Sequence, residues 1–331
     1  MRSLLITSLI LLLAAPAAAV TLKLGTLAPE GAAWMNEMRR GATEIKERTA
    51  GRVEIKLYGG GVMGNEKSML RKIRIGQLQG GAFTGGGLAD VYPDLSLYGL
   101  PLLFDSLEEI DAVRADFDPL LRAGLEEHGF VSFGFAEGGF ALLMGNRPIV
   151  RLDDMKGQKL WVPEGDTVTS AVMEELGLSP ISLPISDVLT GLQTGLVHIV
   201  GVSPIGALAF QWHTKVKYVT EAPMAYLCAV LVIDRKAFDK IDEADRLIVR
   251  EVMERVYQGF DRQNRLDEAA ALAALRKQGL NFVTPQSGEV ARMRERAQGA
   301  MERLSAQGAY SPELYRRIVD LLRERRSGSK P

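Results

Sequence analysis

The order of alternating and helical hydrophobic patterns along the chain predicts an α/β protein. Residues 21–26 and 53–58 alternate apolar and polar side chains, as half-buried strands do. Between them, residues 31–49 place apolar side chains on one helical face. A second helix is predicted over 65–75 and a third short strand over 78–83. Strands that alternate with helices in this way predict a sheet with parallel strands, covered on both faces.

A second unit begins near Phe140. Before it, a helical pattern over 106–128 is interrupted at Asp118-Pro119, where we expect the helix to end and restart. Residues 131–137 and 140–144 predict two consecutive strands. Further elements are predicted at 159–162, 165–176, 186–193 and 226–233.

A long amphipathic helix is predicted over 243–279, where apolar side chains recur every four residues. At ~1.5 Å per residue it would extend over roughly 50 Å, more than one small domain needs. We therefore expect it to lie across two lobes. Because no linker rich in proline or serine separates the halves, we expect crossing strands to join them. The predicted bounds are 20–139 with 227–265 for the first lobe, 140–226 with 281–325 for the second, and 243–279 for the helix across both.

The first nineteen residues have the three regions of a secretory signal peptide. Arg2 precedes an apolar run over 4–13, and Ala17 and Ala19 occupy the small-residue positions before a cleavage site. The run is too short to span a membrane as a helix. We predict cleavage after Ala19 and a protein free in the periplasm, beginning at Val20.

Composition narrows the classes of function. The chain has 331 residues, 40 basic and 41 acidic side chains, which argues against nucleic-acid binding by bulk electrostatics. Its single cysteine, Cys228, excludes an internal disulfide, and three histidines leave little for metal or acid–base chemistry. We predict no cofactor and no metal.

The segment Gly59–Gly64 matches the GxGxxG pattern of dinucleotide-binding loops and lies between a strand and a helix. The next strand, over 78–83, ends without the carboxylate that would bind a ribose. A structural turn followed by an Asn65 helix cap is the favoured interpretation.

Aromatic and glycine residues gather at two strand ends. Phe83 is followed by Thr84 and three glycines, and Trp161 begins a turn into the helix over 165–176. Ligands of open α/β sheets bind beyond the carboxyl ends of strands, so these two ends could face each other across a cleft. The alternative is that Trp161 is part of the core.

Several ordered segments between Leu22 and Asp245 resemble one family: the DctP-type solute-binding proteins of tripartite ATP-independent periplasmic (TRAP) transporters. The segments that carry the resemblance are Gly51-Arg52-Val53, Val62-Met63-Gly64-Asn65-Glu66, Leu100-Pro101-Leu102-Leu103-Phe104, Asn146-Arg147-Pro148-Ile149, Asp154-Met155-Lys156-Gly157-Gln158-Lys159, Gly191-Leu192-Gln193-Thr194-Gly195 and Tyr218-Val219-Thr220. The resemblance implies a two-lobe periplasmic-binding-protein fold, with a long helix across both lobes and a ligand cleft between them. It also implies delivery of a small molecule to the large and small membrane subunits of a TRAP transporter, without catalysis.

The chain departs from this family at the positions that would bind a carboxylate. Trp161 replaces an arginine that clamps the substrate carboxylate, and Ala141 aligns with a second polar or arginine position. The family's Glu-Asn-Pro segment becomes 201–204, and Gly85-Gly86 replaces a position that is often polar. These changes predict a more apolar pocket.

The predicted ligand is therefore larger and more apolar than a C4-dicarboxylate, an aromatic or lipid-like compound. If it is an acid, backbone N–H groups of 85–87 or Arg147 would hold it. Two other classes stay open: an exported sensing protein that feeds a membrane sensor, and an exported hydrolase. The residues predicted to bind the ligand are Trp34, Phe83, Gly85, Gly86, Arg147, Trp161, Glu164, Asp166, Val202 and Ser203.

Overall fold

The computed structural model describes residues 19–328, and within them one mixed sheet of nine strands runs through the molecule. The strand order is β2-β1-β3-β8-β4-β7-β5-β6, with β9 paired to β8. The strands are β1 (Val20–Gly25), β2 (Val53–Tyr58), β3 (Gly80–Thr84), β4 (Phe130–Gly145), β5 (Lys159–Pro163), β6 (Ser179–Leu183), β7 (Ile199–Val202), β8 (Tyr218–Asp234) and β9 (Asn281–Val283). The predicted signal peptide, apart from Ala19, lies outside the described residues.

The helices cover this sheet on several sides. The α-helices are α1 (Ala33–Arg48), α2 (Glu66–Arg74), α3 (Gly85–Leu88), α4 (Leu107–Glu127), α5 (Thr167–Glu175), α6 (Val188–Thr194), α7 (Pro204–Ala209), α8 (Arg235–Phe238), α9 (Glu243–Lys277), α10 (Glu289–Ala306) and α11 (Pro312–Gly328). The short 3-10 helices are η1 (Pro93–Gly99), η2 (Leu152–Met155), η3 (Ile185–Asp187) and η4 (Trp212–Lys215).

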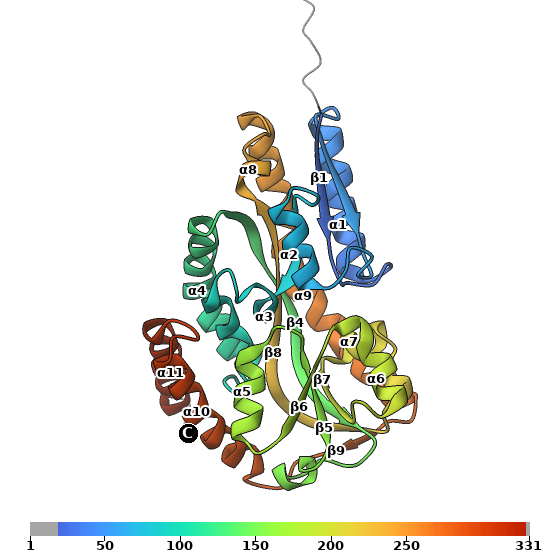
Figure 1. The fold of residues 1–331 in the computed structure, drawn as a ribbon, viewed down its shortest axis with the longest axis vertical. Helices are drawn as coiled ribbons and strands as arrows, with labels where there is room; N and C mark the ends of the chain where they lie inside the picture. Colours follow the sequence, from blue (N-terminus) through green and yellow to red (C-terminus); the bar gives the residue numbers. More distant parts are fainter. Residues whose placement is uncertain (1–18, 329–331) are drawn as a thin grey trace, which may run out of the picture.

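The molecule has two lobes, one above the other in Figure 1. The upper lobe contains β1, β2 and β3, which pair in parallel, and the lower lobe contains β5, β6 and β7, which also pair in parallel. The prediction of a two-lobe α/β fold is confirmed. The expectation of a sheet built on parallel pairs holds only within each lobe, because β4 and β8 run antiparallel to their main neighbours. The residue bounds given above for the two lobes stay a prediction.

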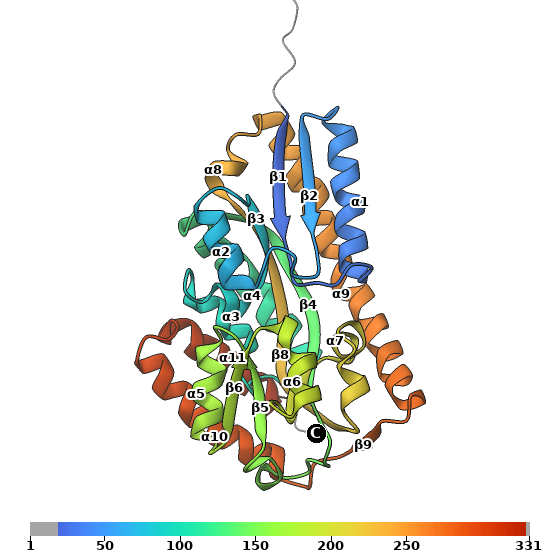
Figure 2. The ribbon, with the colours of Figure 1, turned by 45° about the vertical axis from the view of Figure 1, so that its right-hand side comes forward.

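Strands β4 and β8 pass from one lobe into the other (Figure 2). The two consecutive strands predicted over 131–144 are in fact the single strand β4. Its register against β8 shifts at three places, between Ser132 and Phe135, around Gly139, and again before Leu143. Gly139 has a φ of 75°, a conformation that glycine adopts without strain. The strand therefore bends at bulges and continues.

Helix α9 has 35 residues and confirms the predicted long helix. It packs against α1 in the upper lobe and α7 in the lower lobe, and against β4 between them. Gly41 of α1 allows a close approach, since a Cβ there would lie 3.1 Å from Val256 Cγ2 of α9. Within residues 19–328, no helix is both long and apolar enough to cross a membrane.

Helix α4 is continuous, although a break was predicted at Asp118-Pro119. Ser106 caps its start by accepting a hydrogen bond from Glu109 N, and Pro119 lies inside the helix. Phe117 and Leu121, on either side of the proline, are both buried. Burial of this apolar face offsets the hydrogen bond that the proline cannot donate.

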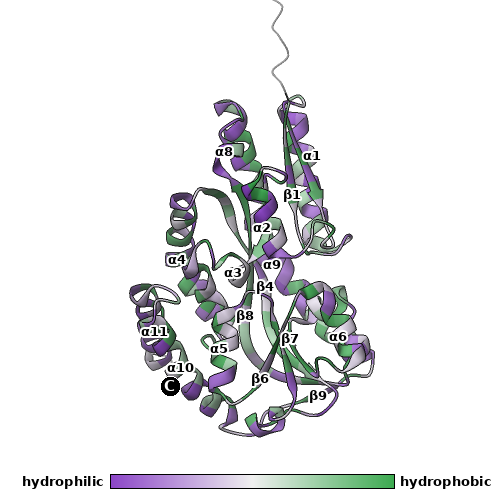
Figure 3. Ribbon diagram, viewed as in Figure 1, coloured by the Kyte–Doolittle hydropathy of each residue, from purple (hydrophilic) through white to green (hydrophobic). Residues whose placement is uncertain are grey.

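Buried apolar side chains form a core in each lobe. In the upper lobe Leu22, Met38 and Val252 join the sheet to α1 and α9. In the lower lobe Trp161 and Trp212 belong to one cluster with residues of α6 and β7. Figure 3 shows hydrophobic residues along the central strands and hydrophilic residues on the outer sides of the helices.

Candidate functional site

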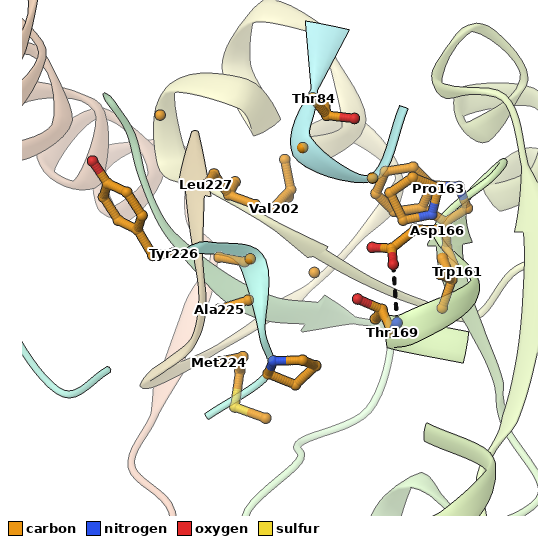
Figure 4. Close-up of a pocket in the computed structure, with 18 of the residues that line it drawn as sticks. Thr84, Trp161, Pro163, Asp166, Thr169, Val202, Met224, Ala225, Tyr226 and Leu227 are labelled. Carbon is orange, nitrogen blue, oxygen red and sulfur yellow. Dashed lines mark hydrogen bonds between the residues drawn. The ribbon is translucent and has the colours of Figure 1, made fainter. Parts of the chain in front are cut away.

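A cavity of about 310 Å³ lies between the two lobes. The residues that line it come from the junction of β3 and α3, from η1, from β5 and α5, from β7 and α7, and from the middle of β8. Both lobes and a crossing strand therefore contribute to its wall (Figure 4). A volume of this size suits a small organic molecule.

The wall is mostly apolar. Its polar side chains include the hydroxyls of Thr84, Ser96, Thr169 and Ser203 and the carboxyl of Asp166. Among the described residues that line the cavity, none is an arginine, a lysine or a histidine. The wall therefore offers no positively charged side chain to an organic anion.

Trp161 lies on β5 and contributes to the wall, while 7% of its surface is exposed. Its Nε1–H donates a hydrogen bond to the carbonyl oxygen of Leu183, at 3.0 Å. Its ring meets the ring of Trp212 edge to face, with 5.0 Å between centroids. Trp161 is thus both a wall residue and a core residue, and its N–H group is already used within the protein.

Asp166 is the N-cap of α5, and its Oδ1 accepts a hydrogen bond from Thr169 N at 2.9 Å. Figure 4 shows its other oxygen turned toward the middle of the cavity. A Cβ on Gly86, from the opposite lobe, would lie 3.0 Å from the Asp166 Cβ. Burial raises the pKa of Asp166 above its usual range, because water is largely excluded from this carboxyl.

Glu66 lies directly behind this part of the wall. Its carboxylate accepts hydrogen bonds from the backbone N–H of Thr84, at 2.5 Å, and from the Thr84 hydroxyl, at 3.1 Å. Burial raises the pKa of Glu66 to about 7, and the nearby charge of Asp166 adds to the rise. The N–H of Gly87 is also in use, since it donates to Thr84 Oγ1. An acid bound at this glycine turn would face two carboxyl groups.

A side-chain hydrogen bond links the lobes beside the cavity. Asn65 Nδ2 donates to Glu164 Oε2, and Asn65 Oδ1 caps α2 by accepting from Ser68 N. The predicted Asn65 cap is confirmed, and the preceding glycines form a turn in which Gly60, Gly61 and Gly64 have positive φ. Closure of the lobes therefore includes a polar contact outside the apolar wall.

Six of the ten residues predicted to bind the ligand line the cavity. They are Gly85, Gly86, Trp161, Asp166, Val202 and Ser203. Their role in binding stays a prediction.

The other four predicted residues do not line this cavity. Phe83 is 1% exposed and packs in the core, because alternation along β3 turns it away from the cavity. Trp34 stacks on Phe260 of α9 at 6.4 Å. Glu164 turns to Asn65, and Arg147 is exposed beyond the end of β4.

Part of the wall was missed by sequence reasoning. Ser96, Tyr98 and Leu100 come from η1 and the turn after it, and Met224 and Ala225 come from β8. Residues 100–104 matched a family segment, which could have indicated a position near the ligand. The β8 residues gave no such signal, since the predicted strand began only at Tyr226.

A charged network lies behind Tyr226. Arg114 donates to Asp261 Oδ2 at 2.7 Å, to Asp118 Oδ2 at 3.1 Å and to the Tyr226 hydroxyl at 3.2 Å. Arg114 is thus paired with two carboxylates and separated from the cavity by Tyr226, whose ring points away from the other wall residues in Figure 4.

A second ion pair extends this network. Arg265 Nη2 contacts Glu137 Oε2 at 2.9 Å, and the Glu137 side chain is 1% exposed. The pair lies on the same side as Arg114, because the Tyr226 hydroxyl contacts Glu137 Oε2 at 3.4 Å.

Other chemistry-bearing groups have structural partners. His128 Nδ1 contacts the carbonyl oxygen of Gly124, and His213 Nδ1 that of Ala207. Burial raises the pKa of the Cys228 thiol, which forms no disulfide. Over residues 19–328, no group of three or more His, Cys, Asp or Glu side chains is arranged to hold a metal.

Two lobes joined by β4, β8 and α9 around an internal cavity are the architecture of a two-lobe solute-binding protein. The model of one family matches residues 24–307: bacterial extracellular solute-binding protein family 7, DctP. The chain belongs to this family, which confirms the resemblance read from the sequence.

Relatives by sequence include binding proteins of known ligand. The C4-dicarboxylate-binding periplasmic protein DctP of Rhodobacter capsulatus is 25% identical over 202 residues, 59% of this chain and 60% of that protein. The sialic acid-binding periplasmic protein SiaP of Vibrio cholerae is 23% identical over 290 residues, 85% of this chain and 88% of that protein. The match to YiiZ of Salmonella typhimurium, at 25% identity, spans 46% of this chain and only 48% of that relative.

Solved structures share the fold. A TRAP periplasmic solute-binding protein from Desulfovibrio salexigens, with bound orotic acid, has a TM-score of 0.84 at 21% identity, over 91% of this chain and 98% of its own. The sugar acid binding protein DctPAm from Advenella mimigardefordensis, in complex with galactonate, has a TM-score of 0.85 at 20% identity, over 93% and 99%. The ligands of these two proteins are organic acids.

Proposed function

We propose that the protein is a periplasmic solute receptor that captures a small organic molecule between its lobes and delivers it to a TRAP-type membrane permease. The observation that carries this proposal is the cavity between the lobes, with walls from both, in a member of solute-binding protein family 7. A ligand that contacts both lobes stabilises the closed arrangement, and a permease can then distinguish the loaded from the empty receptor. The protein acts by binding and not by catalysis.

We further propose that the ligand is more apolar than a simple dicarboxylate, with an aromatic or lipid-like body. Leu143, Leu160 and Val202 supply apolar surface to the cavity from β4, β5 and β7. The relatives named above whose ligand is known bind organic acids, but the resemblance described in the sequence analysis places Trp161 where the family carries its carboxylate-binding arginine. An ionised carboxylate buried without a cationic partner is strongly disfavoured.

Small-angle scattering combined with native mass spectrometry tests the receptor function. The protein is purified without denaturation, any co-purified ligand is identified, and scattering is compared before and after its removal. We expect the ligand-free protein to have the larger radius of gyration and to compact when the ligand returns unchanged. Turnover of the ligand would instead indicate an enzyme, and an unchanged radius would contradict capture by closure.

A further inference from the structure

The cavity has an unusual charge balance for a site that would bind an organic acid. Asp166 is the one charged side chain among the described residues that line it. Glu66 adds a second carboxyl directly behind Thr84, at hydrogen-bond distance from the Thr84 backbone. No ion pair to either carboxyl occurs within residues 19–328. The carboxyl groups of Asp166 and Glu66 therefore affect the electrostatic potential of the cavity without a basic partner.

One cation that contacts a residue of the wall is Arg114, and its charge is already balanced. It forms ion pairs with Asp118 and Asp261, at 3.0 and 2.7 Å. It also donates a hydrogen bond to the hydroxyl of Tyr226, a residue of the cavity wall. Release of Arg114 toward a ligand would leave these carboxylates unpaired at a half-buried position, which is costly.

The geometry of Asp166 suits a donor on the ligand. One oxygen is held by the backbone of α5, and the other is turned into the cavity (Figure 4). The carboxyl is therefore fixed in direction before a ligand arrives, so little conformational entropy is lost on binding. An ammonium group at this oxygen would form a charge-assisted hydrogen bond in a site with little water.

The rest of the wall suits the body of the same ligand. The Trp161 ring lies on the same side of the cavity as Asp166 (Figure 4), and aromatic rings attract ammonium groups as well as apolar surface. Leu143 and Val202 bound the cavity with side chains that have no polar atoms. A carboxylate in the same place would lie beside a like charge without a counter-ion.

We propose that the ligand is an organic cation, with an ammonium group bound by Asp166 and an apolar body held against Trp161, Leu143 and Val202. This inference rests on the receptor function proposed above and names its substrate class.

Matched probes that differ only in their polar end test the inference. Phenethylamine is compared with 3-phenylpropanoate and 2-phenylethanol, and hexylamine with heptanoate and hexanol, by isothermal titration calorimetry of the ligand-free protein at pH 7.5. We expect at least one amine to bind, ten-fold or more tighter than its matched carboxylate and its matched alcohol.

Two variants then test whether Asp166 is responsible for the preference for amines. Asp166→Asn keeps a residue that caps a helix well but removes the charge. We expect it to weaken amine binding ten-fold or more and to change alcohol binding less than two-fold. The control is Glu174→Gln, which removes an exposed carboxylate from the same helix and should change neither.

The outcomes separate this inference from the receptor function. Carboxylates that bind as tightly as the amines, or an amine preference that survives in Asp166→Asn, would overturn the inference and leave the receptor function in place. Failure of every amine to bind would also overturn it. Failure of the receptor function would show separately, as a scattering profile that no recovered ligand changes.

Discussion

The buried carboxyl of Glu66 makes the stability of the protein depend on pH in an unusual direction. Its pKa in the folded protein is about 7, against an ordinary value of 4.5. Between these two values the folded protein holds a proton at Glu66 that the unfolded chain has released. Stability therefore falls as pH rises from about 4.5 to about 7.

The size of this effect follows from the same two values. At about 1.36 kcal/mol for each pH unit, the difference corresponds to roughly 3 kcal/mol of unfolding free energy. Glu66→Gln removes the ionisation, and the amide oxygen can still accept the hydrogen bond from Thr84 N. We expect the variant to gain about 3 kcal/mol relative to the natural protein when both are moved from pH 4.5 to pH 8.

Urea denaturation at several pH values between 4.5 and 8 measures this difference. Burial also raises the pKa of Glu268 to about 7, but Glu268 is present in both proteins, so its contribution cancels in the comparison. Glu47→Gln, which removes an exposed carboxyl from α1, is the control for loss of one charge. Curves for Glu66→Gln and the natural protein that stay parallel over this range would refute the reasoning.

Further predictions concern the wall, the lobes, the buried ion pair and export. Trp161→Ala should weaken ligand binding by about 1–3 kcal/mol in calorimetry and lower stability by roughly 3 kcal/mol, since the ring also packs on Trp212; unchanged affinity would exclude it from the site. Glu164→Ala should raise the radius of gyration of the ligand-bound protein and change its melting temperature by less than about 2 °C; no change in radius would contradict the contact between lobes. Arg265→Met should cost roughly 3 kcal/mol in urea denaturation, because Glu137 stays buried without its partner, and Glu137→Gln in the same protein should recover part of the loss. Mass spectrometry of periplasmic protein should show Val20 as the first residue; an intact N-terminus would refute cleavage.

Local patterns in the sequence were enough for most of the elements but not for their connections. Residues 53–58 form β2 at the predicted bounds, and Asn65 caps α2 as predicted, because these signals depend on neighbours in the chain. The continuity of β4 and of α4 depends on burial against distant elements. The bulges in β4 and Pro119 both resemble element ends when only neighbouring residues are considered.

The candidate site was predictable at the ends of strands and not elsewhere. Gly86 follows β3, and Trp161 and Asp166 lie at the end of β5; the two strands run in opposite directions, so their carboxyl ends face each other across the cavity. Phe83 was misplaced because a strand end does not reveal which face of the sheet a side chain takes. Arg147 was proposed for its charge, but nothing in the sequence shows that the loop after β4 points away from the cavity.

The way β4, β8 and α9 cross between the lobes limits how such a receptor can change over evolution. Each lobe is assembled from separate stretches of the chain, so exchange of one lobe between two genes would require breakpoints inside two strands and a helix. Recombination at any one of these points would combine halves of elements that never packed together. Substitutions in the cavity wall leave these shared elements intact, so we expect new specificities in this architecture to arise more readily by changes in the wall than by exchange of a lobe.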